Sequence, residues 1–154
     1  SSTACATKKA FEMRALFDVN VLIALHDSDH VHHHVASAWL QESGGHGWAS
    51  CPLTQNGCLR IMAQPGYGQP QPLGVLMAML GRSTATSFHQ FWPDEISLLD
   101  ATRIRHEHVH SPRQLTDLYL LALAVHRGGR LVTFDQRIAI SAVPMAGAEH
   151  LVVL

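Results

Sequence analysis

The chain has 154 residues, a length that suits one domain with a single hydrophobic core. Apolar residues make up 47% and charged residues 15%, which is a globular composition and not that of a disordered chain. No apolar run reaches the roughly 18 residues that a membrane-spanning helix needs, and a formal net charge of −1 means that any surface for nucleic acid would have to be local.

The three cysteines, Cys5, Cys51 and Cys58, do not make a disulfide framework. Cys51 and Cys58 are seven residues apart on a predicted helix, which separates them by about 10 Å and prevents a bridge. Reduced thiols fit a cytoplasmic protein. Residues 1–12 lack the apolar centre of a secretory signal, so we expect an extension added for expression, or else a flexible native N-terminus. We expect residues 13–154 to form a single domain.

The hydrophobic pattern predicts strands that alternate with helices. In chain order the predicted elements are strand 13–18, helix 20–26, a helix that begins within 27–34 and closes at 44, strand 48–49, helix 52–62, loop 65–72, helix 73–80, strand 96–99, helix 112–127, strand 131–134, a helical turn at 137–140 and strand 150–154. Such alternation predicts an α/β three-layer sandwich, in which helices flank a mainly parallel sheet of about four or five strands.

Local signals mark where the predicted helices begin and end. Ser50 is the expected N-cap of the helix after the second strand, with Pro52 in its first turn. Ser111 and Gln114 have capping-box spacing, with Pro112 at the first helical position of the longest apolar helix. Gly81 is expected to end the helix before it.

Three aspartates stand out by position. Asp18 and Asp135 each follow an apolar strand, and Asp117 lies near the start of the long apolar helix. Because the carboxyl ends of parallel strands open on one edge of a sheet, we expect the three to converge there. Converging carboxylates repel one another unless a cation is present, and oxygen ligands suit Mg²⁺ or Mn²⁺. Taken singly, each has a structural interpretation: Asp18 as a helix cap, Asp117 beside a helix dipole and Asp135 in a turn.

Other polar and aromatic residues favour structural roles. Asp100 is typical of a helix cap. The histidines within 30–34 fit a solvated helix start better than a metal site. His106, His108 and His110 alternate along an extended segment, for which contact with RNA or a partner is the weaker alternative. The tryptophans are more typical of a core than of a base-stacking platform; they are Trp39, Trp48 and Trp92.

Three separated segments resemble motifs of the PIN-domain family, and most closely its VapC-like toxins. The segments are LFDVNVLIAL, PLTQNGCLRI and LTDLYLLALAVHRGGRLVTFDQRI, and the resemblance covers residues 13–154. The motif residues are Asp18 and Asn20 in D-x-N, Thr116 and Asp117 in T-D, and Thr133 and Asp135 in T-x-D. The resemblance implies a parallel sheet with an acidic pocket and Mg²⁺- or Mn²⁺-dependent ribonuclease activity. It also implies a homodimer, and a cognate antitoxin that inserts a segment, often with an arginine, into that pocket to form a hetero-oligomer.

The middle motif departs from the family pattern. Many members have Thr-Glu where this chain has Thr54 and Gln55. Glutamine keeps an acceptor oxygen but lacks the charge, so it can orient a metal-bound water while a second metal binds more weakly. This departure leaves one alternative open, a degenerate PIN domain that binds RNA or a protein partner without cleavage.

The resulting hypothesis makes Asp18, Asp117 and Asp135 both catalytic residues and metal ligands. Asp18 and Asp117 would hold one Mg²⁺, with Asp135 bound directly or through water, and a polarised water would attack an RNA phosphodiester in line. The product ends would be a 5′-phosphate and a 3′-hydroxyl. Residues expected to hold or orient the ligands are Asn20, Gln55 and Thr133, and candidates for phosphate contacts are Arg60, Arg103, Arg105, Arg113 and Arg137.

A phosphatase of the haloacid-dehalogenase kind is a rival enzyme, because its nucleophilic aspartate also follows a first strand. Its motif is D-x-D, and here Asn20 stands at the second acid position. The only lysines, Lys8 and Lys9, precede the motif, so no lysine is available downstream. Both features favour the nuclease over the phosphatase.

Overall fold

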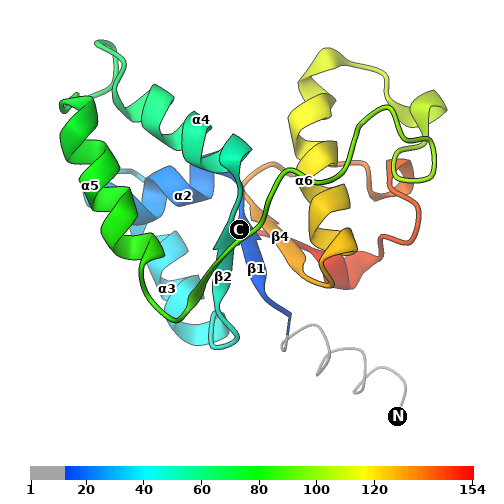
Figure 1. Cartoon of the computed structure of the whole chain (residues 1–154), viewed down its shortest axis with the longest axis horizontal. Helices are drawn as coiled ribbons and strands as arrows, with labels where there is room; N and C mark the ends of the chain where they lie inside the picture. Colours follow the sequence, from blue (N-terminus) through cyan, green and yellow to red (C-terminus); the bar gives the residue numbers. More distant parts are fainter. Residues whose placement is uncertain (1–12) are drawn as a thin grey trace.

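A computed structural model describes residues 13–154 and shows one parallel sheet between helices (Figure 1). Its strands are β1 (Ala15–Phe17), β2 (Trp48–Ser50), β3 (His89–Phe91), β4 (Arg130–Thr133) and β5 (Leu151–Val153). The strand order is β3-β2-β1-β4-β5, and every neighbouring pair is parallel. The predicted α/β sandwich is therefore confirmed. Residues 1–12, for which we expected an added extension, lie outside the described residues, as does Cys5.

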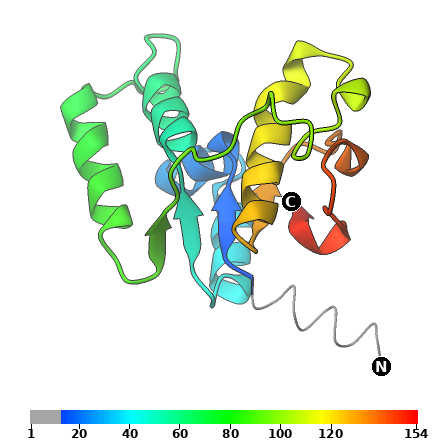
Figure 2. The ribbon, with the colours of Figure 1, turned by 45° about the vertical axis from the view of Figure 1, so that its right-hand side comes forward.

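Helices cover both faces of this sheet, as Figures 1 and 2 show. One face carries α2 (Val19–His26), α3 (His33–Ser43), α4 (Pro52–Met62) and α5 (Leu73–Thr84), and the other carries α6 (Leu115–His126) with four short 3₁₀ turns nearby. Successive side chains of a strand point to opposite faces. Accordingly, Ala15 and Phe17 pack with the α2 side of the core, whereas Leu16 packs with α6. No helix within residues 13–154 is long and apolar enough to cross a membrane.

The third strand is His89–Phe91, so the predicted strand at residues 96–99 is wrong. Residues His89 and Phe91 pair with the two ends of β2, where they form an edge of the sheet. An edge strand needs only one buried side, so it contains polar residues. A prediction based on apolar runs therefore misses it. The apolar run at 96–99 is instead a turn in which the Leu99 amide donates to the Ser97 hydroxyl, and the Leu99 side chain is 85% exposed.

Several predicted boundaries shift. Cys51 caps α4 in place of Ser50, which belongs to β2, and the Thr54 hydroxyl accepts from the Cys51 amide at 3.0 Å. Helix α5 continues past Gly81 to Thr84, because a helical glycine costs only about 1 kcal/mol and Leu80, just before it, is buried. The helical turn predicted at 137–140 lies further along the chain, as a 3₁₀ turn at Ile140–Ala142. Strand β4 ends at Thr133, one residue before Phe134.

Buried side chains agree with the expected structural roles. Trp48 and Trp92 are buried, and the Arg130 guanidinium lies 4.8 Å from the ring centre of Trp39. Cys51 and Cys58 are buried free thiols, as predicted for this pair. The core therefore accounts for the tryptophans without a base-stacking role.

Two glycines of the fold offer a matched test of packing. A Cβ on Gly129 would lie 2.6 Å from the Trp92 ring and 2.7 Å from the Arg14 carbonyl oxygen, whereas a Cβ on Gly81 would meet nothing within 4 Å. We expect Gly129→Ala to lower the free energy of unfolding by about 1–3 kcal/mol. Gly81→Ala should raise it by about 0.5–1 kcal/mol. Urea denaturation measures both, and equal effects of the two substitutions would contradict this packing.

Candidate active site

Asp18 lies at the carboxyl end of β1, where it is 5% exposed. Its Oδ1 accepts a 2.7 Å hydrogen bond from the Val19 amide and so caps α2. Its Oδ2 accepts a 2.7 Å hydrogen bond from the Thr133 hydroxyl of β4. Asp18 is thus a helix cap and also faces the neighbouring strand end, so its two interpretations are compatible.

Thr133 connects the ends of the two central strands. It is fully buried, and its hydroxyl donates to Asp18 while accepting the Asp135 amide at 3.0 Å. A hydroxyl has one donor and two acceptor sites, so both bonds can exist together. One side chain therefore fixes the Asp18 carboxylate and the path of the chain toward Asp135.

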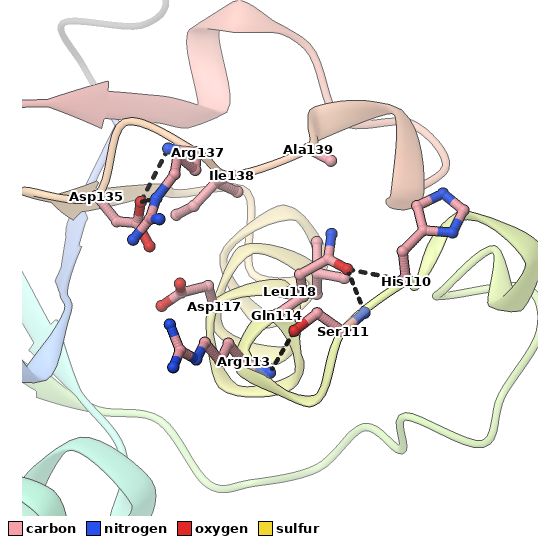
Figure 3. A pocket seen from close by; sticks show the side chains of 10 residues that line it. All are labelled: His110, Ser111, Arg113, Gln114, Asp117, Leu118, Asp135, Arg137, Ile138 and Ala139. Atoms are coloured by element: carbon pink, nitrogen blue, oxygen red, sulfur yellow. Dashed lines mark hydrogen bonds and ion pairs between the residues drawn. The ribbon is translucent and has the colours of Figure 1, made fainter.

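Asp117 and Asp135 lie close to each other in the lining of a pocket next to these strand ends (Figure 3). Asp117 comes from the first turn of α6, and Asp135 follows β4 by two residues. The Arg137 amide donates to Asp135 Oδ1 at 2.8 Å, and the Arg137 Nε lies 3.7 Å from the same oxygen. The Arg113 side chain lies beside Asp117 (Figure 3). Each of these two carboxylates thus has an arginine close by.

Burial and like charge disturb the titration of these aspartates. Burial, the charge of Asp18, and a hydrogen bond and charge from Asp135 raise the pKa of Asp117 to about 7. Burial also raises the pKa of Asp18, although the hydrogen bonds from Thr133 and Val19 oppose that rise. The pKa of Asp135 is lowered, chiefly by the hydrogen bond from the Arg137 amide. The hydrogen bonds and arginines of the site therefore do not fully compensate the negative charge of its three carboxylates.

The donor set fits a hard divalent cation. Among residues 13–154, no three His, Cys, Asp or Glu side chains are grouped closely enough to hold a metal ion between them. Mg²⁺ does not need such a cage, because it is usually bound by one or two carboxylates and keeps several waters. A cation at Asp18 and Asp117 would also relieve the repulsion that raises the Asp117 pKa.

Asn20 and Gln55, both expected to support the metal ligands, lie in different places. Asn20 lines a cavity of about 350 Å³ together with Asp18 and Thr116. The Gln55 Nε2 donates to the Ser50 hydroxyl at 2.9 Å, and that hydroxyl is 2.7 Å from the His89 Nε2. The Gln55 amide is therefore engaged with β2 and β3, and it does not line the cavity at Asp18.

Helix α4 presents different residues to the site. Asn56 and Arg60 line the Asp18 cavity, and Gly57 packs so closely that a Cβ on it would lie 2.8 Å from Val19. Arg60 was expected only as a phosphate contact, and Asn56 was not expected at the site. The signal was available, since residues four apart share one face of a helix and Gln55 is turned away from that face by one position.

Of the three alternating histidines, two contact neighbouring loops and one lines the pocket at the site. His106 Nε2 lies 2.9 Å from the Leu98 carbonyl oxygen, and His108 Nδ1 lies 3.3 Å from the Ser141 hydroxyl, so both contact neighbouring loops. His110 instead lines the pocket that contains Asp117 and Asp135. Contact with RNA stays a prediction, and of the three only His110 is placed for it.

The raised pKa of Asp117 predicts a stability effect that depends on pH. The folded state binds this proton more tightly than the unfolded chain, whose value is near 3.8, so stability is lost as pH rises through about 7. In EDTA, Asp117→Asn should therefore melt higher than the parent at pH 8, with each kcal/mol gained worth about 2–4 °C. The advantage should shrink toward pH 5. A melting-temperature difference that is the same at both pH values would contradict the buried repulsion.

Known proteins have sequences related to that of this chain. The model of the PIN domain family matches residues 15–143. Ribonuclease VapC44 of Mycobacterium tuberculosis is 51% identical over 142 residues, which are 92% of this chain and 100% of the relative. Ribonuclease VapC39 of the same species is 41% identical over 131 residues (84% and 94%), and Ribonuclease VapC29 is 39% identical over 127 residues (82% and 90%). The chain therefore belongs to the PIN-domain family.

Proposed function

We propose that this protein is a metal-dependent ribonuclease and the toxin of a toxin–antitoxin pair, and that it hydrolyses RNA phosphodiesters in the cytoplasm. The observation that carries the proposal is the set of three aspartates at one sheet edge, where the half-buried Asp117 is close enough to Asp18 and Asp135 to feel the charge of both. The relatives named as VapC ribonucleases support the same reaction, since they match most of the chain.

Asp18 and Asp117 would hold one Mg²⁺ or Mn²⁺, with Asp135 bound directly or through water. When bound, the cation supplies a polarised water as nucleophile and neutralises charge that develops on phosphorus. The protein's own contribution is orientation. Thr133 holds the Asp18 Oδ2, and the Arg137 amide holds the Asp135 Oδ1, so neither carboxylate is free to turn away.

Arginines flank this acidic centre on both sides. Arg60 lines the cavity at Asp18, whereas Arg113 and Arg137 line the pocket at Asp117 and Asp135. An RNA strand that crosses the carboxylates would therefore meet guanidinium groups before and after the scissile phosphate. Such contacts position the backbone without reading its sequence.

The proposed partners are RNA, a cognate antitoxin and a second copy of the chain. The antitoxin would place a cationic side chain against the repelling carboxylates, where charge complementarity favours it. Exposed apolar side chains on α5 offer surface for a protein partner: Leu73, Val75 and Met77 are each at least 50% exposed. The homodimer and the toxin–antitoxin hetero-oligomer are parts of the same proposal.

A degenerate PIN domain that binds without cleaving is the second candidate. Gln55, in place of the usual glutamate, is the feature that favours it. The Gln55 amide is hydrogen-bonded to Ser50. The replacement of a charged glutamate by Gln55 therefore affects the surroundings of β2 and β3 more directly than the three aspartates. We therefore favour a catalytic protein that depends on a single cation.

Loss of either proposed ligand should abolish cleavage. We expect Asp18→Asn and Asp117→Asn each to reduce Mg²⁺-dependent cleavage of RNA by at least about 100-fold, because a ligand charge is lost at the reacting centre. Asp29→Asn is the matched control, since it removes an exposed carboxylate elsewhere. End-labelled RNA, resolved on gels with Mg²⁺ or EDTA, measures the rates. Parent-like cleavage by both ligand variants would refute the proposed site.

The Thr133 hydroxyl should be needed for positioning. Thr133→Val removes the donor to Asp18 at nearly constant volume, and we expect it to reduce kcat about 10–100-fold. Thr133→Ser keeps the hydroxyl and should restore most of that loss. The Mg²⁺ concentration for half-maximal rate should rise in the valine variant alone. If valine and serine behave alike, the hydroxyl does not hold Asp18 for catalysis.

A further inference from the structure

The pocket at Asp117 and Asp135 extends well beyond the two carboxylates. It encloses about 340 Å³, which falls within the range of small-molecule sites. The apolar part of its lining comes from Leu118, Ile138 and Ala139; in Figure 3, Ile138 lies beside Arg137, and Ala139 lies farther from the carboxylates. A metal ion and its waters do not require this apolar part, so the pocket has space for an additional, apolar ligand group.

Two polar side chains of this pocket are fixed by the start of the α6 segment. The Gln114 Oε1 accepts from the His110 amide at 2.7 Å and from the Ser111 amide at 2.9 Å. These two donors leave the amide only one orientation, with its oxygen toward the backbone. The Ser111 hydroxyl oxygen accepts from the Arg113 amide at 3.3 Å. The capping box thus occupies acceptors of both residues.

What remains on Gln114 is a hydrogen-bond donor, and the Ser111 hydroxyl keeps its donor and one acceptor site. Figure 3 draws no hydrogen bond from the Gln114 Nε2 to another residue that lines the pocket, and it shows this nitrogen turned toward the segment that carries Ile138 and Ala139. The Ser111 hydroxyl keeps its proton free to donate. The pocket therefore has hydrogen-bond donors on Gln114 and Ser111 together with an apolar lining. This combination suits a flat, partly apolar ligand that carries acceptor groups.

We propose that this pocket holds a nucleobase next to the scissile phosphodiester and prefers a keto base, guanine or uracil. The inference rests on the proposed ribonuclease function, because a phosphate at Asp117 and Asp135 brings the adjoining base within reach of the same pocket. The guanine O6 and the uracil O4 accept from the Gln114 Nε2. In the same orientation adenine and cytosine present the amino groups N6 and N4, which are donors and would face that donor unpaired. Gln114 is thus a specificity residue.

The test uses a substitution that keeps the capping box. Gln114→Glu preserves an acceptor for both backbone amides, since glutamate also serves at this position, but it replaces the donor with an acceptor. Gln114→Met removes donor and acceptor without adding charge. Cleavage of a random-sequence RNA pool with Mg²⁺, followed by sequencing of the product ends, gives the base frequencies on each side of the cut. Melting temperatures report whether each variant is folded.

We expect the parent to favour guanine or uracil about tenfold at one flanking position. Gln114→Glu should cut more slowly overall, because it adds negative charge, and should shift the preference toward adenine or cytosine. Gln114→Met should flatten it. Enrichment of guanine alone or of uracil alone supports the proposal equally and identifies the base. Unchanged base frequencies in either folded variant would overturn it.

Failure of the proposed function is distinguishable from failure of the pocket. If the parent cuts no RNA with Mg²⁺ or Mn²⁺, the ribonuclease proposal fails. The pocket is then judged by binding of the four 5′-mononucleotides in EDTA, measured by calorimetry. Tighter binding of GMP or UMP, lost in Gln114→Met, supports a keto-base pocket. Equal or absent binding of all four nucleotides overturns it.

Discussion

The partial burial and mutual repulsion of three carboxylates are the constraint on which this site depends. Strands β1 and β4 are neighbours at the centre of the sheet, so the residues that follow them must share one edge. Asp18 is buried there, and Asp117 enters from α6; the partial burial of Asp117, then the charge of Asp18 and the hydrogen bond and charge of Asp135, raise the pKa of Asp117 to about 7. Nothing in the packing requires acids at these positions. Their presence is a local loss of stability that the two packed faces of the sheet must offset.

The loss is limited by hydrogen bonds that the fold itself supplies. The Asp18 carboxylate accepts from Val19 as the cap of α2 and from Thr133 across the strand pair. Asp135 accepts from the Arg137 amide of its own turn. Asp117 has no comparable donor among these bonds, and it is the aspartate with the largest rise in pKa. The proposed cation site is therefore most sensitive at Asp117, where the charge is least compensated.

The sequence predicts where the three aspartates lie, because two simple rules suffice to place them. Apolar strands were visible around Asp18 and Asp135, and the edge rule for parallel sheets brings their ends together. Strand β3 was missed because an edge strand is polar on one side. Ile96 and Leu98 gave the false strand, because they belong to an apolar run although they pack against the core from a loop. The placement of Gln55 required the rotational phase of α4, which a motif match does not supply. Asn56, one residue later, occupies the face toward Asp18.

The capping box at Ser111 shows how a local folding signal carries functional information. Glutamate and glutamine serve equally as its fourth residue, since either can accept from the backbone amides that precede the helix. Helix initiation therefore does not decide between them. The second atom of the side chain does differ: in Gln114 it is a donor held beside the apolar end of the pocket, and in a glutamate it would be an acceptor with negative charge close to Asp117. A glutamate there would increase the same repulsion that already raises the Asp117 pKa. The amide both spares the acidic centre a further charge and leaves a fixed donor beside it, so the start of α6 is tied to the chemistry of the site.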